Sequence, residues 1–100
     1  MSHYNVSPEA RTDLDAIWDY YALELENVDA ADKIRDELFD AMRRLAKTPG
    51  MGHFRSDLAK EPVRFWQVRK FLIVYRREKA PIEIVRVLHA ARDVAAILES

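Results

Sequence analysis

The stretch RFWQVRKFLIVYRRE, Arg64–Glu78, decides the fold of this 100-residue chain. Charged residues alternate with apolar and aromatic ones in its first half, and apolar residues run almost unbroken through its second half. Alternation and a high content of β-branched and aromatic residues are typical of β-strands. The pattern predicts strands over Val63–Arg69 and Phe71–Glu78. The turn between them falls near Arg69-Lys70, although this dipeptide lacks the Asn-Gly chemistry of tight hairpins.

Further elements are predicted on both sides of this stretch. Ile82–Ala90 repeats the strand pattern after a turn at Lys79-Ala80-Pro81, and residues 3–6 have the composition of a short first strand. Ala91–Glu99 has the alanine content and the apolar spacing of a short closing helix.

Two amphipathic helices are predicted between the first strand and the strand series. Ser7-Pro8-Glu9 combines an N-cap residue, a proline at the first helical position and an early acid, and apolar steps of three and four continue to about residue 25. Asn27 or Asp29 caps a second helix, which Pro49-Gly50 ends. Its apolar stripe consists of Ile34, Leu38, Ala41, Met42 and Leu45. The order β-α-α-β-β-β-α predicts a single α+β domain over residues 1–100, with an antiparallel sheet packed against a helical hairpin.

The composition narrows the class of protein. The chain has no cysteine and no apolar run near the roughly 20 residues of a membrane span, and its N-terminus lacks the pattern of a signal peptide, so we expect a cytoplasmic protein. Residues 1–48 hold 11 acids and 6 bases, whereas residues 49–100 hold 6 acids and 10 bases. Two explanations fit this split: a basic face for an acidic partner, and mutual neutralisation of the two halves.

Neither a metal nor a cofactor is expected. The histidines His3, His53 and His89 lie 50 and 36 residues apart, without the close spacing of a zinc site. The only glycines are Gly50 and Gly52, so the chain has no glycine-rich phosphate loop.

Three features together resemble the ParE branch of the ParE/RelE toxin superfamily. They are P-x-x-G-H-x-R-x-D-L at Pro49–Leu58, Tyr75 within an apolar strand, and R-V-L-H-x-x-R-D at Arg86–Asp93. The resemblance covers essentially the whole chain. It implies a toxin of a type II toxin–antitoxin or plasmid-stabilisation module, bound in a hetero-oligomer by a ParD-like antitoxin, with DNA gyrase as the target. It also implies that the toxin is not an enzyme, has no membrane partner, and meets DNA only through its antitoxin.

Two alternative functions remain open. One is a RelE-like endonuclease that cuts messenger RNA on the ribosome, which needs a proton acceptor, cations and an acid around the phosphate. Its candidate catalytic residues are His89, Arg92 and Arg55, although the predicted closing helix would cover His89. The other is a degenerate, non-toxic module that only binds its antitoxin.

We predict that the sheet carries the antitoxin-binding surface. An amphipathic helix and an extended acidic segment of the antitoxin would dock there, with arginines pairing to its acids. The predicted contact residues are Arg64, Phe65, Trp66, Arg69, Arg76, Arg77 and Arg86. Candidate target contacts are His53, Arg55 and His89. Direct binding of nucleic acid is disfavoured, because alternation puts Phe65 and Trp66 on opposite faces. Tyr75 shares a face with Phe71 and Ile73, so we predict a core tyrosine with a hydrogen-bonded hydroxyl.

Overall fold

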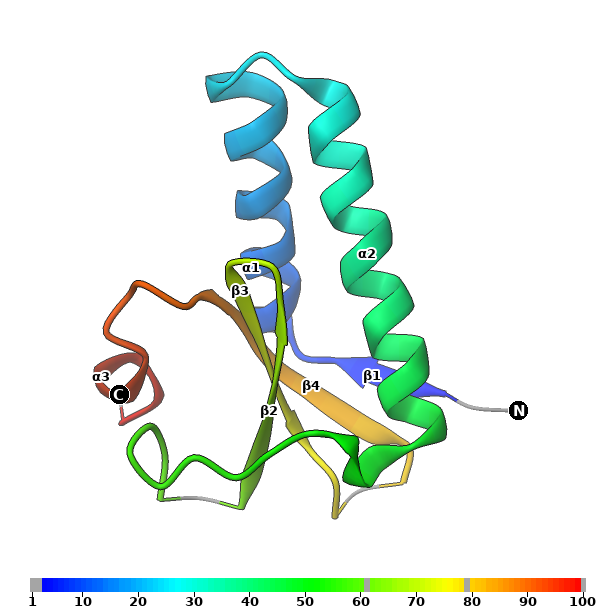
Figure 1. The fold of residues 1–100 in the computed structure, drawn as a ribbon, viewed down its shortest axis with the longest axis vertical. Coiled ribbons are helices and arrows are strands. Elements are labelled where there is room, and N and C mark those ends of the chain that lie inside the picture. The colour runs from blue at the N-terminus through cyan, green and yellow to red at the C-terminus, as the bar shows by residue number, and fades with distance from the viewer. Residues whose placement is uncertain (1–2, 61, 79, 100) are drawn as a thin grey trace.

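A computed structural model describes residues 3–60, 62–78 and 80–99, in which a helical hairpin projects from a small sheet (Figure 1). The elements are β1 (Tyr4–Val6), α1 (Pro8–Asp19), the π-helical turn η1 (Tyr20–Glu24), α2 (Val28–Lys47), the 3-10 turn η2 (Pro49–Met51), β2 (Val63–Val68), β3 (Phe71–Arg76), β4 (Ile82–His89) and α3 (Val94–Glu99). This order confirms the α+β fold predicted from the sequence.

The sheet has the strand order β1-β4-β3-β2. The three longer strands pair antiparallel, as predicted. The short β1 instead lies parallel to β4, with Tyr4 opposite Ile82. The backbone nitrogen of Ser7 then donates to the oxygen of Ile84 at 2.9 Å, which brings the start of α1 onto the sheet.

The turn between β2 and β3 lies at Arg69-Lys70, where the sequence placed it. Val68 pairs with Phe71, so only two residues make the turn. Arg69 adopts a left-handed conformation with a φ of 54°, a conformation that usually favours glycine or asparagine. The side chain of Gln67 donates to the oxygen of Arg69 at 2.9 Å and holds this unfavourable turn. Lys79 of the other predicted turn lies outside the described residues.

Both helices begin at the predicted caps. The hydroxyl of Ser7 accepts a hydrogen bond from the nitrogen of Ala10 at 3.0 Å, and the side chain of Asn27 accepts one from the nitrogen of Ala30 at 3.0 Å. Asn27 rather than Asp29 is therefore the cap of α2. The first helix extends to Glu24, close to the predicted end, but its last five residues form the π-helical turn η1.

Two apolar clusters lie on opposite faces of the sheet. The first core joins the hairpin to the sheet, and the predicted stripe of α2 is buried in it. The second core contains Val63, Phe65, Leu72, Val74, Leu88 and Val94. Ile97 and Leu98 of α3 pack on this second core, so α3 closes the face that the hairpin leaves open. None of the helices in the described part of the chain is long and apolar enough to cross a membrane.

Candidate partner-binding surfaces

Tyr75 anchors the loop that follows α2. Its side chain is fully buried, and its hydroxyl donates to the oxygen of Pro49 at 2.7 Å and accepts from the nitrogen of Gly52 at 2.9 Å. Burial raises the pKa of the Tyr75 hydroxyl, which keeps it protonated. A Cβ on Gly52 would lie 2.7 Å from Cε1 and 2.9 Å from Cζ of this ring, closer than carbon atoms can pack. The prediction of a core tyrosine with a hydrogen-bonded hydroxyl is confirmed.

Arg64 and Arg77 lie beside the same loop. The guanidinium carbon of Arg64 lies 4.1 Å from the ring centre of Phe54, and its Nη1 donates to the oxygen of Gly52 at 2.9 Å. The Nε of Arg64 is buried without a hydrogen-bond partner. The guanidinium of Arg77 lies within 4 Å of the position that a Cβ on Gly50 would take. Neither arginine pairs with a carboxylate of the described chain, so both can bind an acid from a partner.

The other predicted arginines are paired within the chain. Arg69 contacts Glu37 at 2.8 Å. Arg76 lies 3.7 Å from Glu83. An acidic partner has to compete with these carboxylates. The pair from Arg69 to Glu37 also joins the basic half of the chain to the acidic half, as expected if the halves neutralise each other.

Arg86 has the strongest internal pairing. Its Nε and Nη2 donate to the two carboxylate oxygens of Asp13 at 2.8 and 3.0 Å, and this hydrogen bonding raises the pKa of Arg86. Asp13 also accepts from the nitrogen of Val87 at 3.0 Å. The three bonds connect α1 to β4, so the structure gives Arg86 a structural role in addition to its predicted antitoxin contact.

Phe65 and Trp66 point to opposite faces, as alternation predicted. Phe65 is only 3% exposed and belongs to the second core. Trp66 packs against the first core and stacks on the ring of His53, with 6.1 Å between ring centres. His53 is further held by two backbone hydrogen bonds to Phe65, at 2.9 and 2.8 Å. Phe65 can therefore support a docking surface from beneath but offers almost none of its own area.

The candidate nuclease residues are not brought together. His89 and Arg92 line one groove with Lys70 and Tyr21, and the Nδ1 of His89 accepts from the nitrogen of Ala91 at 3.0 Å.

Arg55 instead forms two hydrogen bonds to Asp57, at 3.0 and 2.8 Å. These bonds lower the pKa of the Asp57 carboxyl. Asp57 lines a groove with Val63 and Arg76, at the end of the β2–β3 ladder opposite His89. Five residue steps along a strand put about 17 Å between those ends.

The expectation that the closing helix covers His89 is wrong. The groove beside His89 is lined by residues of α1, η1, β3 and β4, and by Leu25, Lys70 and Arg92, but by none from α3. Because Val94, Ile97 and Leu98 pack on the second core, α3 lies on the opposite face of the sheet. The side chain of His89 meets Phe71 of the first core edge-on, with 5.5 Å between ring centres.

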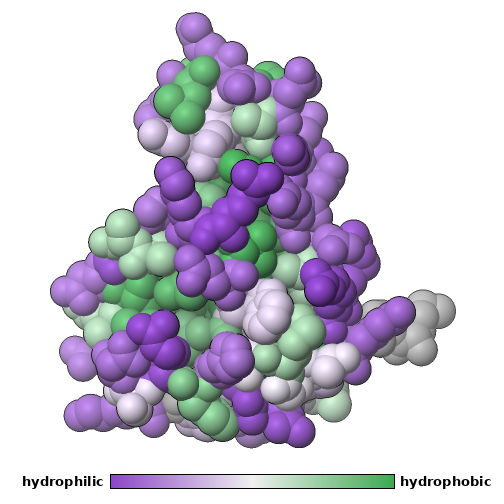
Figure 2. Space-filling view, in the orientation of Figure 1, coloured by the Kyte–Doolittle hydropathy of each residue, from purple (hydrophilic) through white to green (hydrophobic). Residues whose placement is uncertain are grey.

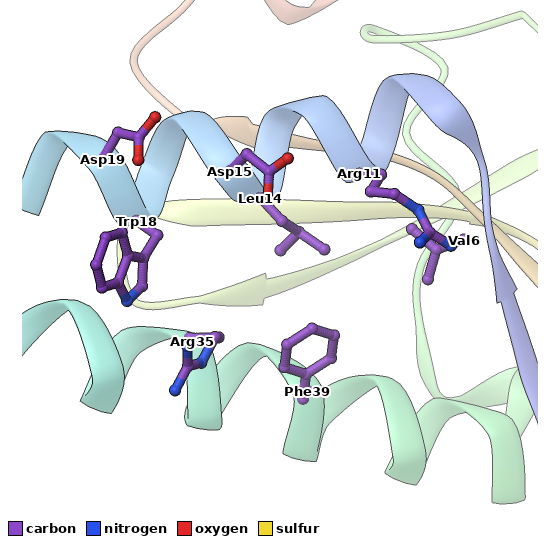
Figure 3. A pocket seen from close by; sticks show the side chains of 8 residues that line it. All are labelled: Val6, Arg11, Leu14, Asp15, Trp18, Asp19, Arg35 and Phe39. Atoms are coloured by element: carbon purple, nitrogen blue, oxygen red, sulfur yellow. The ribbon is translucent and has the colours of Figure 1, made fainter.

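A groove between the two helices was not predicted (Figure 3). Leu14 and Trp18 of α1 face Phe39 of α2 across it, and its volume is about 690 Å³. Charged side chains border it: Arg11, Asp15, Asp19 and Arg35. The helical spacing of Leu14 and Trp18 marked one apolar face of α1, but the spacing alone could not show that part of this face stays uncovered.

Comparison with known proteins places the chain in a family. Residues 4–94 match the sequence model of the ParE toxins of type II toxin–antitoxin systems, parDE. The chain belongs to the ParE toxin family. Toxin ParE1 of Caulobacter vibrioides is 34% identical over 98 residues, which make up 98% of this chain and 99% of that protein. A chain from the chromosomal ParDE toxin–antitoxin system of P. aeruginosa is 25% identical, with a TM-score of 0.72 over 89% of this chain and 96% of that one.

The ParE match covers the residues of the two surfaces described above, the loop that Tyr75 anchors and the groove between α1 and α2. It begins at Tyr4 in β1 and contains Gly52, Tyr75 and His89. It ends at Val94, the first residue of α3. Among the described residues of this ParE toxin, no group of histidines and acids could hold a metal ion.

Proposed function

We propose that a cognate ParD-like antitoxin neutralises this ParE toxin, and that the toxin inhibits DNA gyrase when the antitoxin is absent. One observation carries the proposal, the likeness along almost the whole chain to Toxin ParE1 and to a chain of a ParDE system. In this proposal the toxin acts by binding and is not an enzyme.

The antitoxin is proposed to dock in two modes. An amphipathic helix would lay its apolar face over Leu14, Trp18 and Phe39, because the groove between α1 and α2 offers apolar side chains between charged borders. An acidic segment would follow the sheet side and pair with Arg64 and Arg77. Together these contacts should bury more than about 2,000 Å², as obligate partners do.

The absence of enzymatic activity is supported by the separation of the candidate residues. Metal-free RNA cleavage needs its acid, base and cations around one phosphate. His89 and Arg55 lie at opposite ends of the sheet, and Arg55 is already bound to Asp57. The remaining pair of His89 and Arg92, with Lys70 nearby, favours the endonuclease as the second candidate function.

Expression of the chain alone and together with its antitoxin tests the proposal. We expect growth to stop with the chain alone, with DNA damage signalling and impaired supercoiling as the first defects, and to recover on co-expression. The purified protein should inhibit purified gyrase. Early loss of translation with cut messages would instead support the endonuclease, and normal growth would contradict both toxic functions.

A further inference from the structure

The end of the helical hairpin exposes an unusual amount of apolar surface. Among the described residues only five large hydrophobic side chains are exposed, and four of them lie within nine residues. They are Tyr20, Leu23, Leu25 and Val28, with exposed fractions of 48, 66, 51 and 52%. We call Tyr20–Asp29 the hairpin tip. Apolar side chains gathered in one exposed place typically mark a binding site.

The hairpin tip is also acidic. Residues 12–32 contain seven Asp and Glu and no Lys or Arg. Asp13 and Asp32 are bound to Arg86 and Arg35, respectively. Glu24, Glu26 and Asp29 of the tip are exposed, and none of them pairs with a cation of the described chain. The tip therefore combines apolar area with carboxylates that form no ion pair within the described part of the chain, although Lys70 and Arg92 line a groove with Tyr20 and Leu25.

The backbone of the tip is held in unusual conformations. The nitrogen of Leu25 donates to the oxygen of Tyr20 at 3.0 Å in the π-helical turn, and Glu26 has a φ of 50°. The nitrogen of Asn27 then donates to the oxygen of Tyr21 at 2.9 Å. π-turns and left-handed residues are costly and are found disproportionately at functional sites. Here they present Leu23–Asp29, seven consecutive exposed residues, at the end of the hairpin.

The tip lies far from Arg64 and Arg77, which sit beside the loop that follows α2. A helix of 20 residues such as α2 spans about 30 Å, and the tip is at its N-terminal end, away from the loop that holds Arg64. Figure 1 shows the hairpin standing clear of the sheet, and Figure 2 shows hydrophobic surface near its free end. The tip would repel the acidic antitoxin segment proposed for Arg64 and Arg77, and its charge favours a basic partner.

We propose that the hairpin tip is the surface with which the toxin holds its protein target, at a site on the target that is both basic and apolar. The inference rests on the proposed inhibition of gyrase. Leu23 and Leu25 supply apolar contact, and Glu24, Glu26 and Asp29 pair with cations of the target and speed its encounter with the toxin. The charge argues against nucleic acid and anionic membranes as occupants, because both would be repelled.

Two variants of the tip test this inference, with purified gyrase as the probe. Leu23→Ser removes the most exposed apolar side chain, and the double variant Glu24→Lys with Glu26→Lys reverses the charge. Each should weaken gyrase binding and inhibition by about tenfold or more, and the charge variant should also lose most of the salt dependence of association. The affinity for the antitoxin should change less than about twofold.

Matched controls lie elsewhere in the same chain. Phe54→Ser removes the fifth exposed hydrophobic side chain, and Asp36→Lys reverses an exposed charge in the middle of α2. Both controls should inhibit gyrase like the unaltered toxin. Circular dichroism should show that all four variants remain folded, because the altered side chains are exposed.

The possible outcomes separate the two proposals. Inhibition of gyrase by the unaltered toxin and equally by both tip variants would overturn the inference and leave the proposed function standing. Failure of the unaltered toxin to bind gyrase would overturn both. A tenfold loss of antitoxin affinity in Leu23→Ser would assign the tip to the antitoxin. Dissociation of a homodimer by that variant, measured by light scattering, would assign it to a second copy of the chain. Either assignment overturns the inference.

Discussion

The sheet side and the hairpin tip differ in how their side chains are held as well as in charge. On the sheet side, Arg64 is bound to the oxygen of Gly52 and lies against Phe54, and Arg69 is fixed by Glu37. At the tip, Leu23 and Glu24 are exposed on a turn that is held by the backbone bonds from Leu25 to Tyr20 and from Asn27 to Tyr21. A surface ordered before binding loses little conformational entropy on association, whereas an exposed turn can adjust to its partner. This difference is consistent with our proposal that the two surfaces bind two different partners.

Asp13 and Arg86 connect these two regions. Their ion pair lies between the middle of α1 and the middle of β4, with side chains that are only 10 and 23% exposed. If this pair couples the hairpin to the sheet, breaking it should disturb both surfaces, whereas changes within either surface should stay local.

The largest effect is expected for Asp13→Ala. The substitution leaves Arg86 and the nitrogen of Val87 without their shared acceptor, so the free energy of unfolding should fall by about 2–4 kcal/mol. Chemical denaturation would measure the loss. Asp13→Asn keeps a neutral acceptor and should cost less. A loss below about 1 kcal/mol in Asp13→Ala would mean that the hairpin and the sheet are not coupled through this pair.

Tyr75→Phe should have the next largest effect and should be confined to the sheet side. The variant lacks the hydroxyl that donates to the oxygen of Pro49 and accepts from the nitrogen of Gly52. Loss of these two hydrogen bonds should lower the free energy of unfolding by about 1–3 kcal/mol. Hydrogen exchange should speed up in the loop after α2 but not at the hairpin tip. Equal acceleration at both places would contradict the separation of the two regions.

The same variant has a distinct pH dependence. The folded protein raises the pKa of Tyr75 above its ordinary value of 10.0, so the buried hydroxyl stabilises the fold fully below that value. Stability should then decline as pH rises through the raised pKa, because the unfolded chain loses the proton more easily. In Tyr75→Phe this part of the decline should disappear, which parallel denaturation curves on the alkaline side would detect.

Arg64→Gln should weaken antitoxin binding without affecting the gyrase interaction. Loss of a charge that is already ordered for an acidic partner should reduce affinity by about tenfold, measured by titration calorimetry. Arg43→Gln is a suitable control, because Arg43 is 62% exposed and its ion pair with Asp40, at 3.6 Å, stays within α2. A comparable loss of gyrase inhibition in Arg64→Gln would show that the antitoxin and the target share the sheet side.

The smallest effect is expected for His89→Ala. His89 and Arg92 line the same groove, but Arg55 does not. Toxicity should therefore change by less than about threefold if the toxin acts without catalysis. Colony counts after induction provide the measurement. A hundredfold loss of toxicity in a folded variant would favour the endonuclease and overturn the view that the tip and the sheet side are sufficient.

The fold could be predicted from the sequence because its signals are local. The cap at Ser7, the stripe from Ile34 to Leu45, and the alternation after Val63 each report on a few neighbouring residues, and the structure has all three. The parallel direction of β1 could not be predicted, because three residues of strand carry no information about the direction of their partner.

The surfaces were harder to predict because they depend on distant pairs. The sequence marked Arg86 as a surface cation, but its partner Asp13 lies 73 positions away. It also placed α3 over His89, whereas the apolar residues of α3 match the second core on the other face. The exposed tip does have a local signal in the sequence, the run without any Lys or Arg from residue 12 to residue 32.

The contact between Gly52 and Tyr75 also restricts how this sequence can change over generations. A side chain at position 52 would collide with the ring at position 75, and the ring is fixed by the loop that contains Gly52. A substitution at either position alone should destabilise the fold, so a larger residue at position 52 should be found only where a smaller residue replaces the tyrosine. The two positions, 23 residues apart, should therefore be inherited as a pair.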